Sequence, residues 1–545
     1  MPASTHCVLA AQLETGGQRH GLHFFMVQLR GEDLVPVPGV RLGDIGSLAG
    51  ENSTPIGWLQ LKDVRVPRRA LLERRQHVTV SGEYVMGAPR GSMRPSGSGS
   101  GWGGQDKKLD AKTRQTLAYL TMLKTRVALA SGAAGALSKA CVIAARYSCV
   151  RQQGFVGEGE AREAQVIDYS VQRFRVLKWT ATAYAFRQAT AWMDARQRQA
   201  ADSQGNVDLS DLPEVHASAC GLKALSCVVA ADGIEDLRRA CGGHGFLNSA
   251  GLAPIEAGFK GPHTTGEGDY VLLSLQTARF LVKSLAAARR GEPLSGLASC
   301  LAPLRDPAFR PEQARPAPAR DAEALREPVF LLRLFEARTV RAVVRAGKLL
   351  EDDLRAGKAQ DAAWNANALA LYHAAQCHTR YFILSKFVEQ AVKVQDAPCR
   401  AALLRLVALY ALADLVEGQG WAGVLTAHEA DLCDEAIQHL SAALRPDVIA
   451  LVDAFDLTDR SLNSAIGGKD GNVYEALMHA AETSRLNVNN DGSPVLVPTF
   501  MDPLKPFIDT QFLRLRGGVQ AQPAPSASPA RESPAPAHRV QASKL

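Results

Sequence analysis

The pattern of apolar and polar positions changes character along the chain. Up to about residue 87 it consists of short β-rich runs, such as HFFMVQLR (23–30) and GWLQLKDVRVP (57–67), separated by turns that contain Gly and Pro. From residue 109 onward, apolar residues recur over long stretches at the spacing of an α-helix. The pattern therefore predicts a mainly α-helical protein with a small β-domain at its start.

Four long helices are expected in the first half of the helical part. Their apolar periodicity covers residues 113–152, 164–199, 212–243 and 267–291. The third is expected to stop at Gly242-Gly243, because glycine commonly ends a helix. Ala, Gly and Ser are frequent in these helices, which indicates close packing in a bundle.

Segments of different composition divide the chain, and 545 residues are enough for two or three domains. Residues 89–107 are Gly/Ser-rich and basic, whereas residues 301–327 are Pro-rich. The predicted organisation is a β-domain at 1–88, a Gly/Ser-rich loop at 89–107, a helical domain at 108–300, a linker at 301–327, a second helical domain at 328–515 and a tail at 516–545.

Composition excludes several classes of protein. The hydrophobic fraction of 46% is that of a globular chain, and no uncharged apolar stretch is long enough to predict a membrane span or a secretory signal. The ten cysteines contain no CxxC pair and no Cys/His cluster, which favours free thiols and predicts no metal site. The net charge of +7 is spread along the chain without an aromatic-interleaved basic patch, so no nucleic-acid partner is expected.

The sequence ends in Ser543-Lys544-Leu545, which matches a peroxisomal address. The preceding residues are rich in Pro, Ala and Ser and are unsuited to packing a core. Such a tail holds the tripeptide where an import receptor can bind it. The expected location is the peroxisomal matrix, and the import receptor is an expected partner.

Glu267 is the leading candidate for chemistry. It lies between Gly266 and Gly268, where a loop becomes a helix. A carboxylate in the first turn of a helix interacts favourably with the helix dipole and needs no further role. Alternatively, it is a general base, and the flanking glycines let a substrate approach the backbone closely.

Three motifs together resemble the core of the peroxisomal acyl-CoA oxidases, within the acyl-CoA dehydrogenase superfamily. They are ACGGHGF (240–246), EGD (267–269) and LQTARFLVK (275–283). The resemblance continues in the family's order through most of residues 6–510, and the C-terminal tripeptide agrees with it. It implies an acyl-CoA dehydrogenase-like β-barrel domain, followed by a helical bundle and a second, C-terminal helical domain.

The resemblance also implies a reaction, namely FAD-dependent oxidation of a fatty acyl-CoA by molecular oxygen in peroxisomal β-oxidation. The products are a trans-2-enoyl-CoA and hydrogen peroxide. Glu267 occupies the position of the family's base, which removes the α-proton while a hydride passes to flavin N5. A homodimer is expected from the family. Straight-chain, branched-chain and bile-acid-type substrates all remain open.

Residues for holding FAD follow from the same resemblance. Arg151 and Gln153 match an Arg-x-Gln that reaches the FAD phosphates, often from the neighbouring subunit. Gly242 and Gly243 match a turn near the adenine-pyrophosphate end, and Asp269 matches a position that borders the flavin. A solvated helix end for Arg151 and simple helix termination for the two glycines are the alternatives.

The sequence departs from the family pattern at its start. Met1 falls inside the expected β-domain, so a preceding helical domain and a flavin-contacting stretch are expected to be missing. A truncated gene model and a genuine short form both account for this. Two other functions therefore stay open: a non-catalytic subunit that lacks flavin, and a dehydrogenase that uses an electron-transfer flavoprotein.

Overall fold

The structure is a computed structural model. It describes residues 4–50, 54, 56–72, 76–86, 111–154, 162–202, 212–294, 296–418, 420–489, 491–495 and 504–506. The chain divides into two compact units, Met1–Leu477 and Met478–Leu545. Apart from the end of α14 and the C-terminal tripeptide, the features discussed below belong to the first unit.

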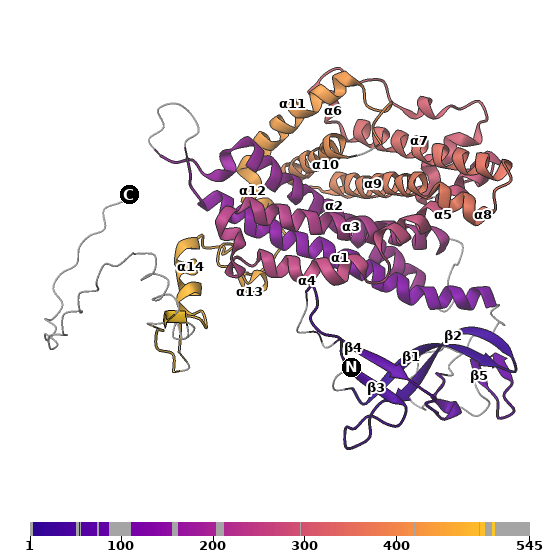
Figure 1. The fold of residues 1–545 in the computed structure, drawn as a ribbon. Helices are drawn as coiled ribbons and strands as arrows, with labels where there is room; N and C mark the ends of the chain where they lie inside the picture. Colours follow the sequence, from indigo (N-terminus) through magenta and orange to yellow (C-terminus); the bar gives the residue numbers. More distant parts are fainter. Residues whose placement is uncertain are drawn as a thin grey trace, which may run out of the picture. The chain divides into compact units, whose positions relative to one another are not determined.

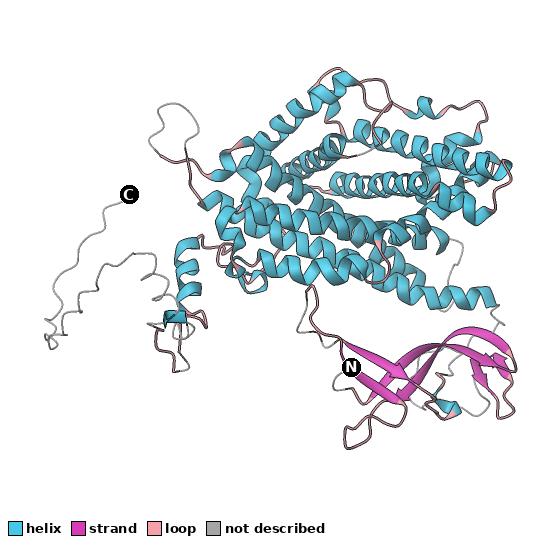
Figure 2. Ribbon diagram, viewed as in Figure 1, coloured by secondary structure: helices cyan, strands magenta, loops and turns pink. Residues whose placement is uncertain are grey.

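Antiparallel strand pairs form the N-terminal part (Figures 1 and 2). The pairs are β1 (His6–Thr15) with β2 (Gln18–Gln28), β3 (Val40–Asp44) with β4 (Gly57–Leu61), and β5 (Gln76–Val78) with β6 (Tyr84–Met86). Gly16 and Gly17 join β1 to β2 with φ angles of 58° and 73°. Two successive positive φ angles are what a two-residue type I′ hairpin requires, which explains this glycine pair.

The β-barrel expected from the family resemblance is absent from the described residues. Each described strand pairs with a single partner, so the six strands form three separate two-stranded sheets. A barrel closes only when every strand is hydrogen-bonded on both sides. The expectation of a barrel was therefore wrong for this part of the chain. A small core that includes Val27, Leu29 and Val40 packs β1 to β4 together instead.

Helices make up the rest of the first unit. The first half contains α1 (Ala111–Val150), α2 (Ser170–Asp202), α3 (Leu212–Ala240), α4 (Leu252–Thr265) and α5 (Tyr270–Arg289). The second half contains α6 (Ala322–Leu325), α7 (Pro328–Arg355), α8 (Gln360–Ala366), α9 (Ala368–Lys393), α10 (Ala397–Glu417), α11 (Ala427–Leu444), α12 (Val448–Asp453) and α13 (Asp459–Leu462), after which α14 (Val473–Glu482) crosses the boundary between the units. The four predicted long helices are confirmed as α1, α2, α3 and α5. Helix α4 was not predicted, because Gly258, Gly261 and Pro262 interrupt its helical pattern.

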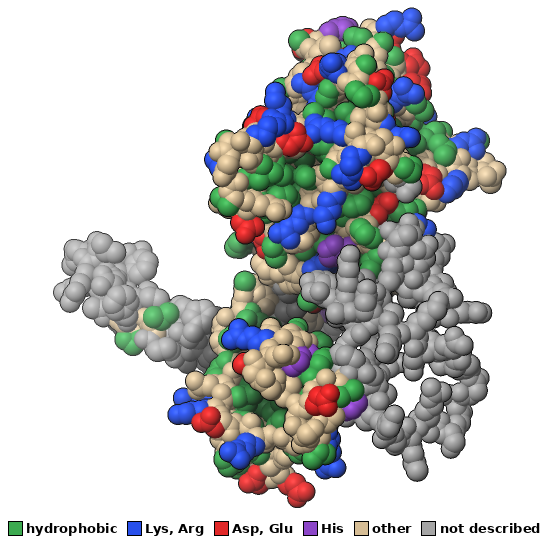
Figure 3. Space-filling model, turned by 90° about the vertical axis from the view of Figure 1, so that its right-hand side faces the viewer, with side chains coloured by type: hydrophobic (Ala, Val, Ile, Leu, Met, Phe, Trp, Pro, Cys, Tyr) green, Lys and Arg blue, Asp and Glu red, His purple; other side chains and the backbone are tan. Residues whose placement is uncertain are grey.

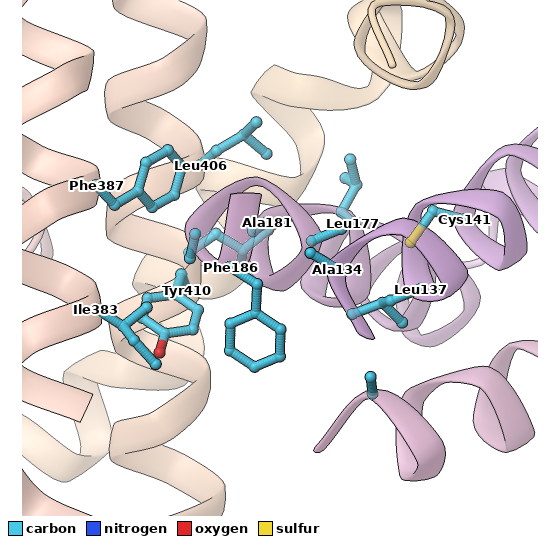
Figure 4. Packing of buried hydrophobic residues seen from close by; sticks show 14 of the residues in the cluster. Ala134, Leu137, Cys141, Leu177, Ala181, Phe186, Ile383, Phe387, Leu406 and Tyr410 are labelled. Carbon is cyan, nitrogen blue, oxygen red and sulfur yellow. The ribbon is translucent and has the colours of Figure 1, made fainter. Parts of the chain in front are cut away.

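One hydrophobic core runs through both halves of the helical part. Helix α2 contacts α1 and α3 as well as α9, α10 and α11. Figure 4 shows residues of α2 between side chains of α1 on one side and side chains of α9 and α10 on the other. The labelled residues are Ala134, Leu137 and Cys141 of α1, Leu177, Ala181 and Phe186 of α2, Ile383 and Phe387 of α9, and Leu406 and Tyr410 of α10. Fully buried alanines in α1 and α2 let these helices approach closely, as their composition predicted.

Three described segments are long and apolar enough, by length and composition, to cross a membrane. They are Met122–Val150, Leu212–Ala240 and Tyr270–Arg289. Other parts of the protein bury 61%, 83% and 44% of their most apolar windows, respectively. Packing among helices thus covers more than half of the first two windows and somewhat less of the third.

Charged side chains of both signs are mixed on the surface. Figure 3 shows Lys and Arg interspersed with Asp, Glu and hydrophobic side chains on one face of the molecule. The net charge of +7 therefore does not gather into a single-sign region on that face.

A largely buried carboxylate, Asp414 of α10, joins three helices of the second half. Its Oδ2 lies 2.7 Å from Nη1 of Arg338 on α7, and its Oδ1 lies 2.6 Å from Nε of Arg380 on α9. The Arg338 guanidinium also stacks over the rings of Trp421 and Phe335. Burial alone would raise the pKa of the Asp414 carboxyl, but the two arginines outweigh it and hold that pKa below its ordinary value.

Replacing this carboxylate is expected to destabilise the helical part. Asp414→Asn removes the charge that Arg338 and Arg380 share, and the free energy of unfolding should fall by about 3–5 kcal/mol. Chemical denaturation measures the loss. Asp352→Asn is the matched control, because Asp352 pairs with Arg355 on the exposed side of α7 and should change stability by less than about 1 kcal/mol.

The free energy of unfolding that Asp414→Asn loses should depend on pH. The pKa of Asp414 is lower in the folded protein than in the unfolded chain, where it is about 3.9. Its contribution to the free energy of unfolding is therefore fully present above the unfolded pKa and is lost as pH falls through the folded-state pKa. The stability gap between the native protein and Asp414→Asn should therefore narrow below about pH 4. A gap that stays constant into strong acid would contradict this account.

Candidate functional site

Glu267 lies in the connection between α4 and α5, with its side chain exposed. Asp269, two residues later, is the N-cap of α5, and its carboxylate accepts hydrogen bonds from the backbone N–H groups of Val271 (2.9 Å) and Leu272 (3.1 Å). Asp269, and not Glu267, therefore caps the start of α5. The Glu267 carboxylate is left for another role.

The backbone around Glu267 is held in an uncommon conformation. Glu267 has a φ of 57° and Gly268 a φ of 112°. A side chain at Gly268 would also clash, because a Cβ there would lie 2.8 Å from Leu273 Cδ2. Left-handed backbone at a residue other than glycine persists only where its surroundings impose it.

Two cationic side chains supply those surroundings. Lys223 of α3 donates hydrogen bonds to the carbonyl oxygens of Gly268 (2.7 Å) and Thr264 (3.2 Å). Arg126 of α1 donates through Nε to the carbonyl oxygen of Glu267 (3.2 Å). Both side chains are buried, and Lys223 has no exposed surface. We call residues 264–269, the segment bound by these two cations, the Glu267 turn.

Neither cation was identified from the sequence. Both lie on helices that were correctly predicted, but a Lys or Arg within such a helix is usually read as part of its solvated face. The available signal was weak: Lys223 is surrounded by apolar residues in ACGLKALSC, which indicates a buried position.

Apolar side chains are exposed directly beside the Glu267 turn. Tyr270, Val271 and Leu272, in the first turn of α5, are 38%, 40% and 54% exposed. The Tyr270 ring lies 6.1 Å from that of Tyr372 on α9. The exposed carboxylate therefore borders a surface on which an apolar ligand can lie.

Arg151 and Gln153 lie just beyond the end of α1. The Arg151 guanidinium donates to the hydroxyl of Tyr474 (3.2 Å) and to Oε1 of Gln153 (3.4 Å). Among the described residues, Arg151 has no carboxylate within 4 Å. Most of its donors therefore stay available to an anionic ligand.

Gly242 and Gly243 begin a short 3-10 segment, Gly242–Phe246, after α3. Gly242 has a φ of 59°, and the space that a Cβ would occupy is open at both glycines. His244, the next residue, contacts the hydroxyl of Tyr147 at 3.0 Å, and its ring lies 6.4 Å from that of Tyr474. Tyr147 and Tyr474 thus join the glycine turn to the Arg151 region, and the sequence singled out neither tyrosine.

These residues form two clusters along α1, one beside Arg126 in the first half of the helix and one just beyond its C-terminal end. Arg126 contacts the Glu267 turn, and Val150, the last residue of α1, precedes Arg151. The 24 residues from Arg126 to Val150 correspond to about 36 Å of helix. The structure therefore brings Glu267 and Asp269 together, and it brings Arg151, Gln153, Gly242 and Gly243 together. Within one chain it does not join the two groups.

A cavity of about 1040 Å³ lies between α7 and α9. Its lining includes Arg341, Arg345 and Lys348, so it is rich in cationic side chains. Tyr372, whose ring meets that of Tyr270 edge-on, is part of its wall. The sequence patterns gave no indication of this cavity.

The described residues contain no group of three His, Cys, Asp or Glu side chains that could hold a metal ion. All ten cysteines have free thiols. The targeting residues Ser543, Lys544 and Leu545 lie outside the described residues.

Two family models match this chain. The model of the acyl-CoA oxidase C-alpha1 domain matches residues 119–282, and the acyl-CoA oxidase model matches residues 327–507. The human protein named peroxisomal acyl-coenzyme A oxidase 1 is 36% identical over 488 residues, which is 89% of this chain and 70% of that protein. The protein of the same name from Arabidopsis thaliana is 34% identical over 525 residues, 94% of this chain and 72% of that protein.

Solved structures agree with these matches. Acyl-CoA oxidase 1 of Arabidopsis thaliana superposes with a TM-score of 0.81 at 34% identity, covering 93% of this chain and 72% of that chain. Acyl-CoA oxidase-1 of Caenorhabditis elegans, crystallised with FAD and ATP, superposes with a TM-score of 0.77 at 27% identity, covering 93% and 70%.

A methyl group at Gly268 is expected to disrupt the Glu267 turn. Gly268→Ala combines a disfavoured φ with a contact to Leu273, and should lower the free energy of unfolding by about 1–3 kcal/mol. Gly135→Ala is the control, because Gly135 lies inside α1 with open space around its Cβ position and should be neutral or stabilising. Denaturation and amide hydrogen exchange of residues 260–272 measure both variants. Equal behaviour of the two would refute the strained-turn description.

Proposed function

The chain belongs to the acyl-CoA oxidase family, a family of oxidoreductases, and on that premise we propose that it oxidises fatty acyl-CoA in an FAD-dependent reaction. The substrates are a fatty acyl-CoA and molecular oxygen, and the products are a trans-2-enoyl-CoA and hydrogen peroxide. The observation that carries the proposal is the Glu267 turn. It presents an exposed carboxylate, in a backbone conformation imposed by two buried cations, beside an apolar surface.

Glu267 acts as the general base in this proposal. The α-proton of a thioester is a weak acid, so a carboxylate removes it only when the thioester carbonyl is polarised as negative charge develops on its oxygen. The backbone N–H of Glu267 supplies part of that polarisation. The apolar side chains at the start of α5 lie along the acyl chain and exclude water from the reacting carbon.

The residues that would hold FAD fit an anionic dinucleotide. Arg151 offers guanidinium donors to phosphate, with Gln153 hydrogen-bonded beside it. The open space at Gly242 and Gly243 lets a ligand approach the backbone closely. When bound, FAD supplies the redox chemistry by accepting the β-hydrogen as hydride and passing the electrons to oxygen. The FAD in the nematode relative supports this assignment.

The separation of the two clusters supports a homodimer. About 36 Å of α1 lies between Arg126, which binds the Glu267 turn, and the Arg151 region. We therefore assign the phosphate-binding residues at any one site to one copy of the chain and Glu267 to the other. In a symmetric dimer, two equivalent sites would form in this way.

The visible spectrum of the purified chain is the first test. We expect a flavin spectrum that bleaches anaerobically on addition of an acyl-CoA, and peroxide formation in air. Glu267→Gln should retain the flavin but lose turnover by a factor of about 10²–10⁴, because the base is removed. Glu256→Gln makes the same change in α4, where Glu256 pairs with Lys260, and should leave turnover unchanged.

The other outcomes identify the alternatives. Bleaching without peroxide in air, together with electron transfer to an electron-transfer flavoprotein, would indicate a dehydrogenase. A colourless but folded protein would indicate a non-catalytic subunit. Full turnover in Glu267→Gln would overturn the assignment of the base.

We also propose that the protein is located in the peroxisomal matrix, as the names of its relatives support. A fluorescent protein fused before Met1 should accumulate in peroxisomes, because the import receptor binds Ser543-Lys544-Leu545 at the free carboxyl terminus. Removing the tripeptide should leave the fusion in the cytosol. Scrambling an equal number of residues earlier in the tail is the control and should not affect import.

A further inference from the structure

We propose that Lys223 and Arg126 are positioning residues that hold the Glu267 carboxylate at the reacting carbon through the backbone of its turn. The inference rests on the proposed role of Glu267 as the base. It adds two residues on separate helices, α3 and α1, neither of which needs to touch the substrate.

Lys223 is placed as a bridge across the Glu267 turn. Its side chain is fully buried, which is rare for a lysine. Among the described residues, no carboxylate lies within 4 Å of its Nζ, and its hydrogen bonds go to the carbonyl oxygens of Thr264 and Gly268. Thr264 belongs to the last turn of α4, where the helix dipole favours a cation. One ammonium group therefore joins the end of α4 to the residue after Glu267.

Arg126 fixes the carbonyl of Glu267 itself. Its Nε donates to that oxygen, while its Nη1 donates to the sulfur of Cys220 on α3 at 3.4 Å. Burial raises the pKa of the Cys220 thiol to about 11, and burial together with Arg126 lowers the pKa of His216. Both neighbours are therefore neutral near pH 7. In the described part of the chain, no carboxylate lies within 4 Å of the Arg126 guanidinium. The positive charge of Arg126 is therefore directed at the carbonyl oxygen of Glu267.

The backbone conformation explains why two anchors are present. Glu267 has a left-handed φ, which a residue with a side chain adopts only under constraint. Hydrogen bonds from α1 and α3 fix the carbonyls on both sides of this conformation. Removing either anchor would let the turn relax and displace the carboxylate, and a misplacement of about 1 Å in a catalytic group costs about 100-fold in rate.

Lys223→Met tests the bridge with little change in side-chain volume. We expect kcat to fall about 100-fold while FAD content and KM stay near those of the native protein. The kinetic isotope effect with acyl-CoA deuterated at the α-carbon should rise, since proton removal becomes slower. Amide hydrogen exchange of residues 260–272 should accelerate. A purely structural role would instead lower FAD content and stability without raising the isotope effect.

Two further variants complete the experiment. Arg126→Lys keeps the charge but loses the paired donors to Glu267 and Cys220, and should give the same signature with a smaller loss, about 10-fold. Lys178→Met is the control, because Lys178 is also a buried lysine but pairs with Glu417. It should reduce stability and leave kcat and the isotope effect unchanged.

Each result decides the matter. Native kcat and isotope effect in both Lys223→Met and Arg126→Lys would overturn the inference, as would an activity loss explained entirely by lost FAD or unfolding. If Lys223→Met does not fold, the isotope effect of Arg126→Lys gives the answer. Glu267→Gln separates the two proposals: if it retains turnover, the proposed base is wrong and the positioning role fails with it.

Discussion

The packing of α3 inside the helical bundle is the constraint on which the two clusters depend. This helix contacts α1, α2, α4, α5 and α9, and 83% of its most apolar window is buried. Because neighbours surround it, its direction and rotation are fixed by close-packed side chains. Its first half places Lys223 against the Glu267 turn, and its C-terminal end leads into Gly242 and Gly243. A single buried helix thus sets the positions of both groups of candidate residues.

Buried cations are used in two different ways in this protein. Arg338 and Arg380 share the carboxylate of Asp414, so their charges are partly balanced where they join α7, α9 and α10. Lys223 and Arg126 bind backbone carbonyls instead. The first arrangement stabilises the bundle through mutual pairing. In the second arrangement, two buried positive charges hold the conformation of one short turn. Stability alone does not readily explain this use of buried charge.

The Glu267 turn divides two roles between neighbouring carboxylates. Asp269 caps α5 through two backbone N–H groups, so the helix begins without help from Glu267. Glu267 is then exposed, with its main chain rather than its carboxylate held by the bundle. Fixing a catalytic group through its backbone leaves its side chain available for a proton. The Arg151 side chain is likewise left available, in its case for a ligand, since most of its guanidinium donors face no protein carboxylate among the described residues.

By itself, the sequence determined the helical content and the place of its long helices, because the 3.6-residue period of apolar side chains is a local property. Through short motifs that resemble those of the acyl-CoA oxidases, it also singled out Glu267, Asp269, Arg151, Gln153 and the Gly242-Gly243 pair. Only the tertiary structure decided that the described strands pair two by two without closing a barrel, that α4 forms despite its glycines, and that Lys223 and Arg126 meet one turn from different helices. The physical reason is that these features depend on contacts between residues far apart in the chain. A charged residue within a helix carries no local sign that its side chain is buried against a distant carbonyl.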